Sequence, residues 1–199
     1  MLTGLFRRDP KAWRFVRNIL IAFLPAAVIG LIIHDWIETL LGSPVTVAVA
    51  LVVGGIAILI VERLIRHATI DSVEAMPWKT ALGIGFIQCL SMVPGVSRSG
   101  ATILGALSLG VERKTAAEFS FFLALPTMLG ASTLELWSNR HDLGPVGLDG
   151  IAIGFVVSFV IALLVIKAFV SIVSRHGFAP FAWYRILAGT AALIWLLAR

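Results

Sequence analysis

Five apolar runs divide this sequence, and each meets or approaches the length of a membrane-spanning helix. They cover residues 18–33, 45–61, 116–134, 150–173 and 183–198. A helix needs about 20 apolar residues to cross a hydrocarbon core of about 30 Å. Only 14% of the residues are charged and the mean hydropathy is +0.98, whereas soluble domains carry about 25% charged residues. The sequence therefore excludes a soluble domain and predicts an all-α integral membrane protein with a single membrane domain over residues 1–199.

Basic residues gather ahead of the first apolar run. They are Arg7, Arg8, Lys11, Arg14 and Arg17, and the net charge of the whole chain is +5. No nucleic-acid-binding motif accompanies them, so the positive-inside rule and anionic lipid headgroups explain the cluster better. We expect contacts with bilayer lipids, no nucleic-acid partner and a cytoplasmic N-terminus.

Residues 79–110 form an apolar stretch that is broken at its centre by the run Val93-Pro94-Gly95-Val96-Ser97-Arg98-Ser99-Gly100. The arms, 79–93 and 99–110, have 15 and 12 residues. At 1.5 Å per residue neither arm crosses about 30 Å of hydrocarbon. The stretch is therefore either one broken span or a re-entrant hairpin that enters and leaves on the same side.

The distribution of Lys and Arg favours the hairpin. With a re-entrant hairpin, thirteen of the sixteen basic residues, Lys167 and Arg185 among them, fall on the cytoplasmic side. Two fall outside, and Arg98 lies within the membrane. With a single crossing the split becomes ten against five, a weaker positive-inside bias. We therefore predict five transmembrane helices plus one re-entrant hairpin.

The hairpin tip carries the residue types of an anion site. Irregular backbone at membrane depth is tolerated where it lines a cavity or is buried, and an ionisable residue there indicates function. Pro94-Gly95 suits a turn, and Ser97 or Ser99 suits the N-cap of the second arm. Helix N–H groups and the Arg98 guanidinium together suit a phosphate-sized oxyanion. Thr102 follows Arg98 by four residues and shares its helical face.

Glu118 offers a different interpretation of Arg98, since an intramembrane ion pair between the two would hold a kinked helix together without a ligand. The other acidic residues and histidines provide no pair with metal-ligand spacing on one helix. We expect those in the outer loops to be solvated loop residues: His34, Asp35, Glu38, His141 and Asp142. The sequence thus predicts no metal ligands and shows no general base beside the tip.

Residues 94–102 match every fixed position of the motif P-G-x-S-R-S-x-x-T. In this they resemble the undecaprenyl-diphosphate phosphatases, also called bacitracin-resistance proteins. Four flanking segments are similar to the same family, and the likeness runs from about Arg14 to the end of the chain. These segments are 86–90, 117–123, 52–55 and the pair Tyr184-Arg185.

The resemblance implies an inner-membrane protein of bacteria, built from two inverted repeats, with a cavity open to the periplasm. It implies hydrolysis of undecaprenyl diphosphate to the monophosphate, which recycles the lipid carrier of peptidoglycan synthesis and confers bacitracin resistance. It also implies a divalent cation, Mg²⁺ or Ca²⁺, and leaves a homodimer as the candidate assembly. By this resemblance the diphosphate is bound by Ser97, Arg98, Ser99, Thr102 and Gln88, with Arg98 and Ser97 in catalytic roles.

The sequence departs from the family pattern in one respect. The first family signature, roughly E-G-x-T-E-F-L-P-x-S-S-x-x-H, is not found, and its glutamates and histidine are the proposed acid–base, metal-binding or nucleophilic groups. The chain resembles the family from the middle of the first repeat onward, which predicts about three fewer helices.

Two alternative functions are left open. Cleavage of a phosphoanhydride needs an activated water or nucleophile, and no such group is evident beside residues 94–102. An inactive, truncated chain that binds lipid without turnover is therefore one alternative. The other is a transporter or flippase for a lipid phosphate or small anion, because inverted repeats with half-helices at mid-membrane are typical of carriers.

Overall fold

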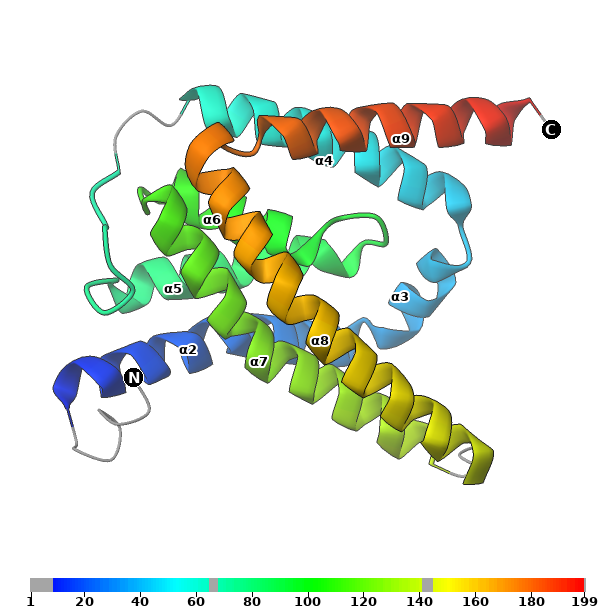
Figure 1. The fold of residues 1–199 in the computed structure, drawn as a ribbon, viewed down its shortest axis with the longest axis horizontal. Coiled ribbons are helices and arrows are strands. Elements are labelled where there is room, and N and C mark those ends of the chain that lie inside the picture. Colours follow the sequence, from blue (N-terminus) through cyan, green and yellow to red (C-terminus); the bar gives the residue numbers. More distant parts are fainter. Residues whose placement is uncertain (1–8, 65–67, 141–144, 199) are drawn as a thin grey trace.

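The computed structural model describes residues 9–64, 68–140 and 145–198, and these ranges are helical apart from short connections and one isolated β-bridge, Ile70 to Val111. Figure 1 shows the arrangement. The helices are α2 (Pro10–Ile32), α3 (His34–Leu41), α4 (Pro44–Leu64), α5 (Trp78–Gln88), the 3₁₀ turn η1 (Cys89–Met92), α6 (Arg98–Ser108), α7 (Arg113–Ser138), α8 (Pro145–His176) and α9 (Ala179–Leu197).

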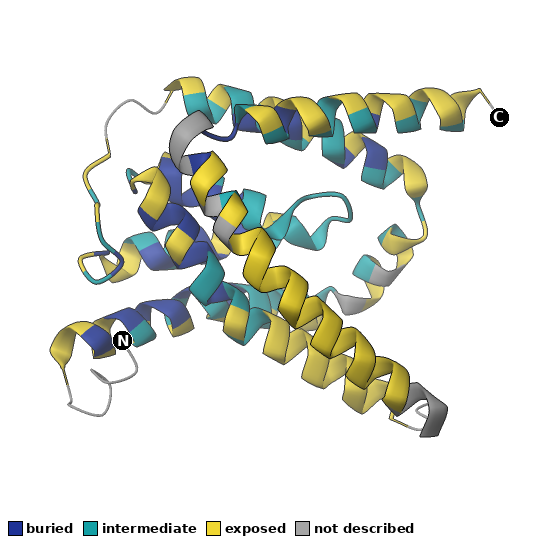
Figure 2. Ribbon diagram, viewed as in Figure 1, coloured by how far each residue is buried: buried dark blue, intermediate teal, exposed yellow. Residues whose placement is uncertain are grey.

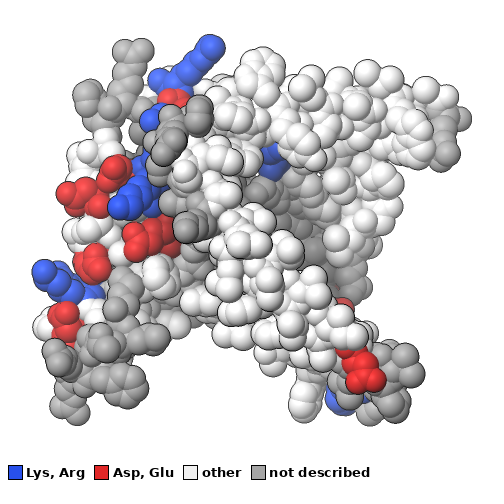
Figure 3. All heavy atoms as spheres, in the orientation of Figure 1, with Lys and Arg blue, Asp and Glu red and all other residues white. Residues whose placement is uncertain are grey.

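Five of these helices, α2, α4, α7, α8 and α9, are long and apolar enough to cross a membrane. Much of their surface is apolar and exposed: Phe155 of α8, for example, is 73% exposed. Figure 2 shows α8 and the far half of α7 as almost wholly exposed. In Figure 3 most of the charged residues gather on the left of the visible face and a smaller group lies at the lower right, with a broad, almost uncharged surface between them. The predicted class, an all-α integral membrane protein, is confirmed.

Helices α4 and α9 pack along each other on one edge of the molecule, while α2 packs along α5 on the opposite side (Figure 1). Small residues make the first contact close. A Cβ at Gly55 of α4 would lie 2.8 Å from the Ala182 carbonyl oxygen, and one at Gly189 of α9 would lie 2.8 Å from that of Ala48. Glycine at such positions lets helix backbones approach within a membrane.

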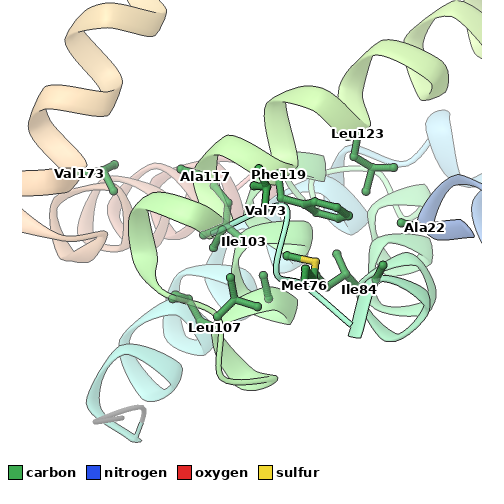
Figure 4. Packing of buried hydrophobic residues seen from close by; sticks show 14 of the residues in the cluster. Ala22, Val73, Met76, Ile84, Ile103, Leu107, Ala117, Phe119, Leu123 and Val173 are labelled. Atoms are coloured by element: carbon green, nitrogen blue, oxygen red, sulfur yellow. The ribbon is translucent and has the colours of Figure 1, made fainter. Parts of the chain in front are cut away.

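The buried core surrounds the base of the α5–α6 hairpin. Figure 4 shows Phe119 of α7 among Met76, Ile84 and Leu123, and Phe119, Ile84 and Leu123 are fully buried. The connection before α5 is tied into this core, because Asn18 Nδ2 donates to the Met76 carbonyl oxygen at 2.7 Å. The base of the hairpin is therefore held by α2, α7 and the segment that precedes it.

The stretch 79–110 folds as two helical arms joined by an irregular tip, α5 with η1 and then α6. The arms pack closely because Gly105 has no side chain: a Cβ there would lie 2.9 Å from Ile87 Cγ2. The entry and exit of this hairpin on one side of a bilayer stays a prediction.

Candidate functional site

The tip of the hairpin is a tight turn that requires glycine. The chain leaves η1 at Val93, whose carbonyl accepts a hydrogen bond from the Val96 N–H at 3.0 Å. Between them Gly95 has φ of +90°, a conformation that residues with a Cβ rarely adopt. Its backbone lies against α4, since a Cβ here would lie 2.8 Å from Val47 Cα. The turn is thus fixed in shape and position by α4.

Ser97 is the N-cap of α6. Its backbone is extended, with φ −65° and ψ 124°, and its Oγ accepts a hydrogen bond from the Gly100 N–H at 3.1 Å. The Ser99 Oγ lies 3.3 Å from the Ser97 Oγ. Two hydroxyl groups therefore meet at the N-terminus of α6, where the helix dipole favours negative charge.

Arg98 is the first residue of α6 and is half-buried. Its Nη1 is buried and has no hydrogen-bond partner. Glu118 is exposed near the start of α7, and the structure shows no ion pair between Glu118 and Arg98. The ion-pair interpretation of Arg98 is therefore not what the structure shows, and its Nη1 is left as a buried donor without a partner.

Thr102 of α6 and Gln88 of α5 are both buried. The Thr102 Oγ1 is 2.6 Å from the Ser120 Oγ of α7 and within 3.1 Å of the carbonyl oxygens of Arg98 and Ser99. Gln88, 2% exposed at the end of α5, has no partner for its side-chain oxygen or nitrogen. The structure brings Ser97, Arg98 and Ser99 to one helix end, while Thr102 anchors that end to α7.

Arg185 of α9 also reaches the tip, whereas the charge distribution predicts it on the cytoplasmic side. Its Nη2 donates to the carbonyl oxygens of Gly95 at 2.9 Å and Ala50 at 3.2 Å. The sequence did carry a signal, because Arg185 lies inside the apolar run 183–198, where an ionisable residue suggests function. The positive-inside bias survives this change, since it moves a single charge.

A largely apolar cavity of about 390 Å³ opens beside the tip, between α4, α5, α6 and α9. Ser97 and Arg185 are its polar residues near the turn, and Ile58, Val61 and Leu104 are among its apolar ones. A cavity of this kind suits a ligand with an apolar chain and an anionic headgroup, with the headgroup bound at the N-terminus of α6.

The described residues contain no group of three His, Cys, Asp or Glu that suits a metal ion. His141 and Asp142 lie outside the described residues, as do the side chains of His34 and Glu38, whereas Asp35 is exposed. The tip itself presents two guanidinium groups, which disfavour a cation. These residues by themselves do not fit a divalent metal.

The fold and the tip define a multi-pass membrane protein with a half-buried, positively charged hairpin end. A family model described as "Bacitracin resistance protein BacA" matches residues 1–191. The chain is 66% identical over all its 199 residues to a protein of Rhizorhabdus wittichii, covering 75% of that protein. It is 60% identical over 193 residues to one of Sphingopyxis alaskensis, with 97% of this chain and 73% of the relative covered. Both relatives are named "Undecaprenyl-diphosphatase". The chain belongs to the BacA family.

Proposed function

We propose that this protein hydrolyses undecaprenyl diphosphate to undecaprenyl phosphate and inorganic phosphate. The observation that carries the proposal is the hairpin tip, where Ser97, Arg98 and Ser99 meet at a helix N-terminus with an unpartnered guanidinium nitrogen. Relatives that share 51–66% identity over nearly the whole chain bear the name of this activity. In this role the protein is a membrane hydrolase that returns the lipid carrier to peptidoglycan synthesis and confers bacitracin resistance.

The tip residues act on the charge of the diphosphate. The free N–H groups of the first turn of α6 and the hydroxyls of Ser97 and Ser99 donate to its oxygens. Arg98 offers a planar pair of donors to two oxygens at once. As water attacks the terminal phosphorus, the bridging oxygen departs with the lipid phosphate, and donors already in place stabilise the charge that develops there. Ser97 and Arg98 are the catalytic residues in this proposal, and Thr102 and Gln88 complete the binding site from behind.

The group that activates water is not assigned to a residue. The hydrogen bonds of Ser97 are to Ser99 and Gly100, and no described carboxylate or imidazole is bonded to it. The isoprenoid chain is assigned to the apolar cavity beside the tip, because its walls are almost entirely hydrocarbon.

Four further features belong to the proposal: the orientation of the N-terminus rests on the distribution of Lys and Arg, and the other three rest on the family. The four features are the bacterial inner membrane, a cytoplasmic N-terminus, a homodimer, and dependence on Mg²⁺ or Ca²⁺. The described residues provide no ligand set for the cation, so no step of the reaction is assigned to it.

The test is phosphate release from farnesyl diphosphate, a shorter isoprenyl diphosphate, by the purified protein with Mg²⁺ or Ca²⁺ present. We expect Arg98→Ala to lower kcat/KM by about 100-fold or more, which is the usual effect of removing a transition-state donor. Arg98→Lys keeps the charge without the paired donors and should recover only part of the loss.

Arg140→Ala is the control, because Arg140 is exposed at the far end of α7 and contacts Trp137. Equal release by Arg98→Ala and Arg140→Ala would contradict the proposed role of the tip. Binding of the substrate without release would instead support the inactive alternative.

A further inference from the structure

Arg185 joins α9 to the hairpin tip across α4. Its Nη2 donates to Gly95 in the turn and to Ala50 in α4, at 2.9 and 3.2 Å. The three residues come from three separate elements, and Arg185 is 90 residues away from Gly95 in sequence. Since one nitrogen serves both carbonyl oxygens, the contact fixes the turn relative to α4 and α9 together.

Gly54 makes this reach possible. The guanidinium lies directly over the Gly54 backbone: a Cβ at this position would overlap Nη2 and would lie 3.1 Å from Cζ. Any side chain on Gly54 would therefore displace Arg185 from the turn. Gly54 and Arg185 therefore act together: Arg185 makes the contact, and Gly54 leaves the space for its guanidinium.

The contact acts on residues that bind the substrate in the proposed function. Gly95 precedes the Ser97 N-cap by two residues and Arg98 by three. The Gly95 backbone lies in close contact with Val47 of α4. Arg185 adds a second restraint, a hydrogen bond to the Gly95 carbonyl oxygen. No carboxylate neutralises the Arg185 charge among the described residues, and its Nε is buried without a partner. Partial burial of the Arg185 guanidinium therefore costs free energy, and its hydrogen bonds go to backbone carbonyl oxygens of α4 and of the tip.

We propose that Arg185 is a positioning residue that holds the Gly95 turn, so that Ser97 and Arg98 meet the diphosphate in a fixed geometry. This inference rests on the proposed function. It makes Gly54 part of the same arrangement, because the missing side chain leaves the space that the Arg185 guanidinium occupies.

The first test compares Arg185→Ala, Gly54→Ala and the double variant for kcat/KM on farnesyl diphosphate. We expect each single change to lower kcat/KM by about 100-fold, the order of effect that a displacement of about 1 Å produces. The kcat/KM of the double variant should lie within about threefold of that of the less active single variant, because two changes that break the same contact are not additive. Arg185→Lys should recover part of the activity, since an ammonium can still reach a carbonyl oxygen. Gly154→Ala is the control, because a Cβ there meets nothing within 4 Å.

The second test does not depend on activity. Cys89 is the only cysteine in the sequence, and it begins η1, which leads directly into the turn. We expect N-ethylmaleimide to label Cys89 at least about threefold faster in Arg185→Ala and Gly54→Ala in detergent, because a freed turn opens locally more often. Gly154→Ala should label at the wild-type rate.

The two tests separate the inference from the function it rests on. If the wild-type protein releases no phosphate, the proposed function fails and Cys89 labelling still decides the role of Arg185. Unchanged labelling in both Arg185→Ala and Gly54→Ala overturns the inference, and so do additive losses in the double variant. If Arg185→Ala does not elute as a single species, Gly54→Ala and Arg185→Lys carry the same comparison.

Discussion

Two half-buried guanidinium groups, Arg98 and Arg185, lie near one turn of the hairpin, and no carboxylate pairs with either among the described residues. Removing an ion from water costs several kcal/mol unless other groups compensate it. Arg185 is compensated in part by two carbonyl oxygens, whereas the Arg98 Nη1 has no partner. At the scale of single residues, the tip is therefore arranged for an anion.

Thr102 shows how the tip is supported from behind. Thr102→Val removes the hydroxyl that lies 2.6 Å from the Ser120 Oγ, and leaves Ser120 buried without that partner. We expect a loss of about 1–3 kcal/mol of stability, measured as a lower apparent Tm in detergent. Thr102→Ser keeps the hydroxyl and should lose much less. An equal Tm for the valine and serine variants would show that the hydroxyl contact contributes little.

Gly95 is the residue on which the turn depends. Gly95→Ala places a Cβ on a backbone with φ of +90° and 2.8 Å from Val47 Cα. A strained residue of this kind costs about 1–3 kcal/mol, so we expect both a lower Tm and reduced phosphate release. Gly150→Ala, in an open part of α8, is the matched control. Wild-type release by Gly95→Ala would mean that the turn tolerates movement.

At the scale of elements, the hairpin is held because α5 lies directly on α2. Gly85 faces the α2 backbone, and a Cβ there would lie 2.9 Å from Ala22 Cα. Backbone atoms cannot give way as a flexible side chain can, so α5 would have to move as a whole.

Gly85→Ala should therefore lower the apparent Tm, with a loss of about 1–3 kcal/mol that is typical of overpacking. Gly83→Ala, on the same helix, meets only the Leu109 side chain, at 3.0 Å, and should be tolerated better. The measurement is the apparent Tm in detergent of both variants and of the wild type. The prediction is wrong if Gly83→Ala has the lower Tm.

The element boundaries show what hydropathy detects and what it misses. The first apolar run covers residues 18–33, but α2 begins at Pro10, where Asp9 caps it by accepting from the Lys11 N–H at 3.0 Å. Likewise α8 extends from Pro145 to His176, beyond the apolar run 150–173. The short helix α3 (His34–Leu41) was not predicted. Apolar runs report the part of a helix suited to hydrocarbon, whereas caps and polar turns decide where the helix ends.

At the scale of the whole molecule, a re-entrant hairpin places both of its ends on one side of the membrane. We expect Lys79→Cys and Arg113→Cys, in a Cys89→Ser background, to react with an impermeant thiol reagent from the cytoplasmic side. Arg140→Cys, at the end of α7, should react from the opposite side. Labelling of the Lys79 and Arg113 positions from opposite sides would mean that the stretch crosses the membrane once.

The proposed dependence on Mg²⁺ or Ca²⁺ is tested on the whole protein, because the described residues contain no ligand cluster for a cation. We expect EDTA to abolish phosphate release and an excess of Mg²⁺ or Ca²⁺ to restore it. Undiminished release in EDTA would contradict the cation proposal and leave the donors of the tip as the source of charge stabilisation.

The sequence by itself determined the membrane class, the broken stretch 79–110 and the motif at 94–102, because each depends on the length of an apolar run or on neighbouring residues. It also carried enough of the motif to place Ser97 and Arg98 at a helix N-terminus. Only the tertiary structure showed that Arg185 bonds to Gly95, that Thr102 meets Ser120, and that Arg98 and Glu118 do not pair. These relations join different elements, up to 90 residues apart. Helical periodicity relates residues within one helix, and the packing of helices alone decides which faces meet.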